Sequence, residues 1–179
     1  MYVKIRRPAK EDEKELHVFF QLVISDTFSK EGIGHMMEDI QEEIHTKKQY
    51  LDKDFESKGL NRYFLIAEVE DKIVGSIEYG PPSELILLHT NNEFQSIVEV
   101  GTVFVHPDFQ RKGIGNRLLN EIYTVLAGKG MSAFCLDSGY ARAQKVWKRK
   151  FGEPDYLLKD FWGKGLHHMI WRITLSTLR

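Results

Sequence analysis

The first third of the chain contains three segments in which apolar residues recur at a regular spacing. Residues 2–6 alternate between polar and apolar positions, which predicts a short strand. The segment 11–28 has apolar residues at helical spacing, and a second helix is predicted over residues 36–58. The residues that mark the buried stripes of these two helices are Leu16, Phe19, Phe20 and Val23, and Ile40, Ile44, Leu51 and Phe55. Gly32 and Gly34 lie between the helices, where we expect a helix C-cap.

The rest of the chain alternates between strands and helices. Residues 62–69 and 73–79 predict a hairpin, and residues 83–95 follow as a long connection with an apolar patch at 85–88. A strand over 98–105, a helix over 114–126 and an apolar strand over 131–136 predict a right-handed crossover between two parallel strands. A helix over 141–150 and strands near 157–162 and 167–175 complete the pattern, which is that of a mixed α/β fold.

Composition narrows the class of protein. A chain of 179 residues with 42% hydrophobic and 28% charged residues matches one globular domain over residues 1–179. The formal net charge of −1 and the scattered basic residues argue against a nucleic-acid partner. No segment has the apolar length of a membrane span or of a signal peptide, and the one cysteine, Cys135, lies in an apolar strand as a structural thiol. We therefore expect a cytoplasmic protein.

The strongest chemical signal is the segment from Gln110 to Gly115, between a predicted strand and the start of an amphipathic helix. Gly113 and Gly115 let the backbone approach a ligand, and the N–H groups of the first helical turn favour an anion. Arg111 and Lys112 add positive charge, and Asn116 offers a further donor. The pattern predicts a site for a phosphate or pyrophosphate, although two glycines also occur where a strand simply turns into a helix.

Other phosphate-binding loops do not fit. A Walker A loop requires a Gly-Lys pair followed by Ser or Thr, and Lys129 and Lys164 are each followed by glycine. A dinucleotide-binding fingerprint requires a third glycine and an acidic residue about 20 positions later, after the first strand. A binder of ATP or GTP is therefore a remote alternative.

Residues 103–115, with the sequence Val-Phe-Val-His-Pro-Asp-Phe-Gln-Arg-Lys-Gly-Ile-Gly, resemble motif A of the GNAT acetyltransferases. The predicted order of elements over nearly the whole chain is also similar to that family. The resemblance implies a central, mostly antiparallel sheet flanked by helices, with strands 98–105 and 131–136 parallel and splayed apart. It also implies acetyl-CoA as the cosubstrate and a small-molecule amine or a protein amine as the acceptor.

The resemblance also suggests roles for individual residues. The pantetheine arm would pair with the backbone of Val103, Phe104 and Val105, and the pyrophosphate would lie on the loop made by Gln110, Arg111, Lys112, Gly113, Ile114, Gly115 and Asn116. A backbone N–H near Val103 or Val105 would stabilise the oxyanion. Glu99 occupies the position of a glutamate base in several relatives, with a surface glutamate as the alternative.

The predicted helix over residues 141–150, which lies outside motif A, departs from the family pattern. Trp147 stands where many members have a tyrosine that protonates the leaving thiolate, and an indole cannot deliver a proton at neutral pH. We therefore expect Trp147 to contact the cofactor and take Tyr140 as the candidate general acid. The alternative is that Tyr140 is only a packing residue. The departure also keeps open a noncatalytic acyl-CoA-binding module with the same fold.

Two further features have simpler interpretations. Seven histidines do not form a metal pattern, since the adjacent His167 and His168 should point to opposite faces of a strand, so no metal is expected. His106 should cap its strand, and the aromatic residues Phe161, Trp162 and Trp171 are expected in the core or, less readily, on the wall of an acceptor pocket. The sequence fits a monomer and a homodimer equally.

Overall fold

The computed structural model describes residues 1–178, and the chain divides into two compact units. Unit 1 comprises Met1–Tyr79 and Thr102–Val125, and unit 2 comprises Gly80–Gly101 and the chain from Leu126 onward. The strands are β1 (Lys4–Arg6), β2 (Tyr63–Val69), β3 (Lys72–Gly80), β4 (Val98–Val105), β5 (Ala133–Ser138), β6 (Tyr156–Leu158) and β7 (His168–Thr174). They belong to one seven-stranded sheet of order β1-β2-β3-β4-β5-β7-β6. The sheet is mixed. Strands β4 and β5 are parallel, with Val98 paired to Phe134 and Glu99 paired to Cys135. The pairs β1-β2, β2-β3, β5-β7 and β6-β7 are antiparallel.

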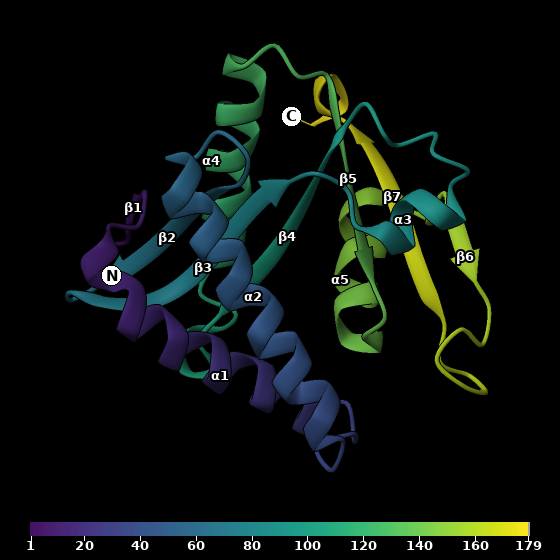
Figure 1. The fold of residues 1–179 in the computed structure, drawn as a ribbon, viewed down its shortest axis with the longest axis horizontal. Helices are drawn as coiled ribbons and strands as arrows, with labels where there is room; N and C mark the ends of the chain where they lie inside the picture. The colour runs from purple at the N-terminus through teal and green to yellow at the C-terminus, as the bar shows by residue number, and fades with distance from the viewer. Residues whose placement is uncertain (179) are drawn as a thin grey trace. The chain divides into compact units, whose positions relative to one another are not determined.

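Most elements lie where the hydrophobic pattern predicts them (Figure 1). The α-helices are α1 (Glu13–Lys30), α2 (Met37–Ser57), α3 (Glu84–His89), α4 (Ile114–Gly128) and α5 (Ala141–Phe151). Short 3-10 turns occupy Lys10–Asp12, Pro107–Phe109 and Leu175–Thr177.

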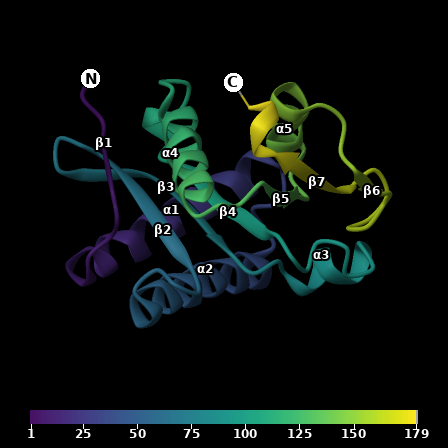
Figure 2. The same cartoon turned by 90° about the horizontal axis from the view of Figure 1, so that it is seen from above.

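In unit 1, helices α1 and α2 lie side by side on one face of strands β1 to β3, and α4 covers the other face (Figures 1 and 2). The predicted apolar stripe of α1 is buried, and the ring of Phe20 contacts that of Phe64 on β2 at 6.2 Å between centroids. On α2, Ile40, Ile44 and Leu51 are buried as predicted, but Phe55 is only partly buried. The core of unit 1 therefore lies between the strands and the predicted helix faces.

Gly75 on β3 sets how closely α4 can approach the sheet. A Cβ at this position would lie 3.0 Å from side-chain atoms of both Ile114 and Leu118. Such contacts are tighter than ordinary packing allows, so the glycine lets the first turn of α4 rest directly on β3. The start of α4 is thereby fixed within unit 1.

Helix α1 ends in the glycine cap that the sequence predicted. The N–H of Gly32 donates to the carbonyl of Ser29 (3.1 Å), and the N–H of Ile33 donates to that of Phe28 (2.9 Å). Gly32 has φ of 78°, so the paired bonds and the left-handed glycine form a Schellman motif. The Gly-Ile-Gly sequence is thus a helix terminus.

A buried carboxylate joins α2 to the start of the sheet. Asp54 is fully buried, its two oxygens accept from the Arg7 guanidinium at 2.6 and 2.8 Å, and one of them also accepts from the N–H of Phe64 at 2.6 Å. Burial raises the pKa of Asp54, and the bonds from Phe64 and Arg7 oppose that rise. Asp54 replaces Phe55 as the inward-facing residue at the end of α2.

Strand β1 is held by an ion-pair cluster centred on Arg6. Its guanidinium donates to both oxygens of Asp12 at 2.6 and 2.9 Å and also pairs with Glu68 on β2. The hydrogen bonds from Arg6 lower the pKa values of Asp12 and Glu68. A lowered pKa means that the folded state favours the ionised carboxylates.

Replacing Arg6 by Gln is therefore expected to reduce stability by about 1–2 kcal/mol at pH 7, because two partly buried carboxylates lose a charged donor. In the wild type, these ion pairs stabilise the fold fully above the carboxylate pKa values of the unfolded chain, and the stabilisation disappears as Asp12 and Glu68 are protonated. The difference in unfolding free energy between wild type and variant should therefore shrink as the pH falls below about 4. Urea unfolding at several pH values measures this. Lys4→Gln, which removes a more exposed partner of Glu68, is the control, and an equal loss from both variants would contradict the assignment.

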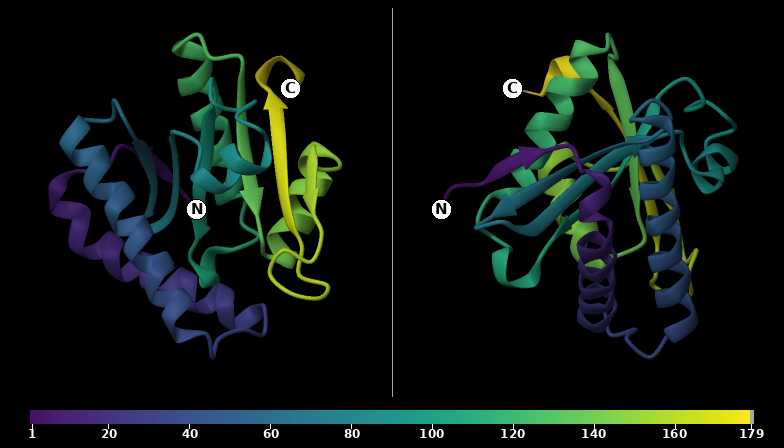
Figure 3. Two further views of the ribbon diagram at one scale, coloured as in Figure 1. Left: turned by 45° about the vertical axis from the view of Figure 1, so that its right-hand side comes forward. Right: turned by 60° about the vertical axis from the view of Figure 1, so that its left-hand side comes forward.

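In unit 2, α3 and α5 cover opposite faces of strands β5 and β7 (Figure 2). Cys135 and Ile170 face Ile86 of α3, whereas Phe134 packs against Phe151 of α5 with ring centroids 6.3 Å apart. Figure 3 shows β7 running between β5 and β6, in agreement with the strand order. Cys135 is fully buried, as expected for a structural thiol.

Three sequence expectations for unit 2 require correction. The connection over residues 83–95 contains the helix α3, which Ser83 caps by accepting the N–H of Ile86 at 3.4 Å. Strand β6 spans Tyr156–Leu158, and the residues after it form turns. Trp171 is in the core as predicted, but Phe161 and Trp162 are 38% and 56% exposed, so the core assignment is wrong for these two.

Candidate active site

A tight turn carries the chain from β4 into the glycine-containing loop. His106 accepts the N–H of Asp108 at 3.2 Å and caps the 3-10 turn Pro107–Phe109, which confirms its structural role. The N–H of His106 donates to the carbonyl of Val74 on β3 at 2.9 Å. The loop therefore begins from a strand end that is anchored to its neighbour.

Two residues of the loop have left-handed backbone conformations. Arg111 has φ of 60° and Gly113 has φ of 81°. A Cβ at Gly113 would meet no atom within 4 Å, so this glycine is explained by its backbone angle rather than by crowding. Gly115 differs, because its φ is not positive and an added Cβ would lie at an ordinary 3.7 Å from Val105.

Side chains fix the loop on the protein side and leave its cations in solvent. The Gln110 side-chain amide donates to the carbonyl of Val105 at 3.3 Å, and its oxygen accepts from Lys30 at 3.4 Å. Ile114 is buried, which ties down the first helical residue. Arg111 and Lys112 are exposed, and the Lys112 ammonium lies 4.8 Å from the centre of the Phe109 ring.

The loop leads directly into the N-terminus of α4. The N–H of Arg117 donates to the carbonyl of Gly113 at 3.1 Å, which closes the first helical turn. The N–H groups at the start of a helix point along its axis and carry the positive end of its dipole. Asn116 is exposed in this turn, so the loop, the helix start and two cations form one anion-attracting surface in unit 1.

The end of β4 belongs to the same unit as the loop. Val103, Phe104 and Val105 are partly buried, and the Phe104 ring contacts that of Phe20 at 6.2 Å in an edge-to-face arrangement. Thr102, just before them, has φ of 50°, which interrupts the regular strand. The sequence did not indicate this residue, since a β-branched residue rarely adopts a left-handed conformation.

Glu99 lies in unit 2, on the first part of β4. Its carboxylate accepts the N–H of Ser83 at 2.6 Å, and it stands opposite Cys135 on β5. Burial raises the pKa of the Cys135 thiol, and the charges of Glu99 and Asp137 add to the rise. Because it is fully buried and its pKa is raised, Cys135 has the character of a structural thiol.

Tyr140 and Trp147 also lie in unit 2, at the start and in the middle of α5. Tyr140 is the N-cap residue; its N–H donates to the Ser138 hydroxyl at 3.1 Å, and its side chain is partly buried. Trp147 is 9% exposed and stacks on Phe151 at 5.8 Å between ring centroids. Trp147 is therefore a buried residue of α5 within unit 2.

The adjacent His167 and His168 both have hydrogen-bond partners within unit 2. His168 begins β7, where its Nε2 lies 2.8 Å from Asp137 and its Nδ1 accepts from the Trp162 indole at 3.1 Å. His167 accepts the N–H of Asp160 at 2.9 Å. Among residues 1–178, no group of His, Cys, Asp and Glu side chains has the arrangement of a metal site. In the same range, no helix is long and apolar enough to cross a membrane.

The predicted residues thus fall into two groups. Unit 1 brings together the β4 residues 103–105 and the loop residues 110–116, while unit 2 contains Glu99, Tyr140 and Trp147. The arrangement in unit 1, a strand followed by a glycine-containing loop and a helix N-terminus, is common in domains that bind phosphate-containing ligands.

Sequence comparison identifies the family. The model of the "Acetyltransferase (GNAT) family" matches residues 30–152, and the chain belongs to this family. No curated protein sequence matches the chain.

Solved structures share the fold. An acetyltransferase described as a GNAT family member from Desulfovibrio desulfuricans is 18% identical, with a TM-score of 0.75 over 97% of this chain and 99% of that chain. The PaiA N-acetyltransferase of Thermoplasma acidophilum, in complex with coenzyme A, is 18% identical with a TM-score of 0.69 over 97% and 99%. A ribosomal-protein-alanine N-acetyltransferase from Brucella melitensis is 19% identical with a TM-score of 0.66 over 96% and 99%.

Proposed function

We propose that this GNAT-family protein transfers the acetyl group of acetyl-CoA to a primary amine of a small molecule or a protein, by direct attack within a ternary complex. One GNAT domain over residues 1–179 would carry this activity. The observation that carries the proposal is the loop from Gln110 to Gly115, with its exposed Arg111 and Lys112 at the start of α4. The positive charge and the free backbone N–H groups of this loop suit the pyrophosphate of coenzyme A. A solved structure of the same fold is a complex with coenzyme A.

Gly115 gives independent support for a ligand at this loop. Neither its backbone angle nor its packing requires a glycine, because a Cβ would make only an ordinary contact with Val105. Glycine also weakens a helix relative to alanine by about 0.5–1 kcal/mol. The close approach of a ligand phosphate to the backbone at Gly115 would explain why this position lacks a side chain.

The chemistry requires a neutral amine and a polarised thioester. We assign Glu99 to accept the proton of the attacking amine, directly or through water, because a lysine-like amine with a pKa of about 10.4 is almost wholly protonated at neutral pH. The amine nitrogen bonds to the thioester carbon, and the C–S bond then breaks. A β4 amide stabilises the oxyanion, and the CoA thiolate takes up a proton as it leaves.

Tyr140 is our candidate for the proton donor to the thiolate. Replacing it by Phe is expected to lower kcat by about tenfold or more, because general-acid catalysis is lost while the ring is kept. The Kd of acetyl-CoA should change little. Steady-state kinetics and calorimetric binding measure both quantities, and an unchanged kcat would leave Tyr140 only its packing and capping role.

The proposed function is tested by measuring thiol release from acetyl-CoA against a panel of small-molecule amines and peptides with free N-termini or lysines. Thermal-shift binding of acetyl-CoA is measured in parallel. Binding with amine-dependent release supports the transferase and separates small-molecule from protein acceptors. Binding without release from any amine favours a noncatalytic acyl-CoA-binding module, and absence of binding rejects the proposal.

A further inference from the structure

Thr102 holds an unfavourable backbone conformation in the middle of β4. Its φ of 50° is in the left-handed region, which costs a residue with a Cβ about 1–2 kcal/mol. Thr102 is β-branched and 5% exposed, so neither a glycine nor solvent relieves the strain. The surroundings must therefore supply the interactions that hold it.

Two buried side chains of β3 supply them. The Ser76 hydroxyl donates to the backbone carbonyl of Thr102 at 2.9 Å, and the Thr102 hydroxyl donates to a carboxylate oxygen of Glu78 at 3.1 Å. Ser76 is fully buried and Glu78 is 2% exposed. Both the carbonyl and the side chain of the strained residue are thus fixed from the neighbouring strand.

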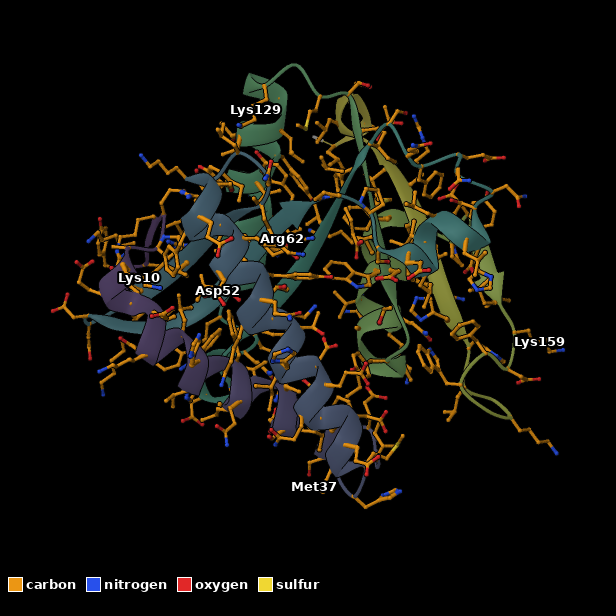
Figure 4. The ribbon with its side chains drawn as sticks, in the orientation of Figure 1. Lys10, Met37, Asp52, Arg62, Lys129 and Lys159 are labelled. Atoms are coloured by element: carbon orange, nitrogen blue, oxygen red, sulfur yellow. The ribbon has the colours of Figure 1, made fainter. Side chains whose placement is uncertain are left out.

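Glu78 is itself held from the other side. Its second oxygen accepts from Arg62 at 2.7 Å, and the Arg62 guanidinium lies 3.6 Å from the centre of the Tyr50 ring on α2. Figure 4 labels Arg62 beside α2 and the strands of unit 1. The residues Tyr50, Arg62, Ser76, Glu78 and Thr102 form what we call the Thr102 support network, and all of them belong to unit 1.

The network determines the direction of one particular amide. The carbonyl of Thr102 and the N–H of Val103 belong to the same planar trans peptide, so they point in opposite directions. Because Ser76 on β3 binds the carbonyl, the N–H of Val103 is directed away from Ser76. Without that bond and the Glu78 contact, the peptide could rotate to relieve the strain at Thr102.

We propose that the Thr102 support network positions the Val103 amide to polarise the thioester carbonyl of acetyl-CoA. Ser76, Glu78 and Thr102 are then positioning residues that act through the backbone. This inference rests on the proposed function and selects one amide, Val103, for the oxyanion contact. A misplaced oxyanion donor costs about 10²–10³ in rate, which gives a reason to keep a strained residue and a buried ion pair here.

The test uses the full chain with acetyl-CoA labelled with ¹³C at the acetyl carbonyl, so that it needs no acceptor. Infrared difference spectra should show the bound wild-type carbonyl at lower wavenumber than in free acetyl-CoA, because a directed amide weakens the C=O bond. Thr102→Val and Ser76→Ala should lose most of this shift. Thr102→Ser, which keeps the hydroxyl, and Thr124→Val, which removes an exposed helical hydroxyl, should keep it.

Binding and kinetics separate positioning from folding. Thr102→Val should reduce kcat about tenfold or more while the Kd of CoA, which lacks the acetyl carbonyl, changes less than about twofold. Three outcomes would overturn the inference and leave acetyl-CoA binding intact: no shift of the carbonyl band in the wild type, a shift that is retained in Thr102→Val, or a loss of CoA affinity in Thr102→Val that parallels the loss of kcat. A wild-type protein that does not bind acetyl-CoA would remove the proposed function and this inference together.

Discussion

Replacing Glu99 by Gln is expected to lower kcat by about 10²–10⁴, the usual contribution of a positioned general base. Gln keeps the length of the side chain and an oxygen that can accept the N–H of Ser83, which Glu99 binds at 2.6 Å. It cannot take a proton from an ammonium group. Acetyl-CoA affinity and thermal stability should therefore stay close to wild type while turnover is lost.

A pH profile makes the Glu99 prediction specific. In the variant, activity should recover as the pH rises toward the pKa of the acceptor amine, because a larger share of the amine is already neutral. Glu121→Gln on the exposed side of α4 is the matched control and should leave kcat unchanged. If Glu99→Gln retains wild-type turnover, the role of Glu99 is only to accept the hydrogen bond from the Ser83 N–H at the start of α3.

Replacing Gly115 by Ala is expected to weaken acetyl-CoA binding at least tenfold without unfolding the protein. The new Cβ would lie 3.7 Å from Val105, and alanine favours a helix over glycine, so the free energy of unfolding should fall by no more than about 1 kcal/mol or should rise. The same methyl group would occupy the space through which a pyrophosphate reaches the amides of the loop. Calorimetric titration and urea unfolding measure the two effects.

Gly128→Ala provides the matched control for Gly115→Ala. Gly128 is the last residue of the same helix, and a Cβ there would meet no atom within 4 Å. This variant should bind acetyl-CoA as the wild type does. Unchanged affinity in Gly115→Ala would place the phosphates elsewhere and would remove the main support for the proposed function.

The sequence predicted most elements because their signals are local. The helical stripe of α1, the glycine cap after it and the strand-loop-helix order around Gly113 each depend on residues close together in the chain. The loop could be found for the same reason, since its glycines, cations and following helix occupy consecutive positions. The parallel pairing of β4 with β5 follows from the helix between them.

Other features depend on contacts that local patterns do not contain. Helix α3 has only six residues, too few for a periodic signal, although Ser83 after a proline could have indicated an N-cap. The left-handed Thr102 is invisible to propensity, because its conformation is held by Ser76 and Glu78 from another strand. The charged Glu78 within an otherwise uncharged part of β3 was the available signal, since a buried carboxylate requires partners.

Because Cys135 is buried, the rate at which it reacts with a thiol reagent can report local opening of the structure around β5. It is the chain's one cysteine, it is fully buried on β5, and its raised pKa further suppresses reaction with thiol reagents. Its modification therefore requires β5 to become accessible, so the labelling rate under native conditions measures the free energy of that opening. A single cysteine introduced on the surface would in turn accept a spectroscopic probe in the folded protein without competition from the native thiol.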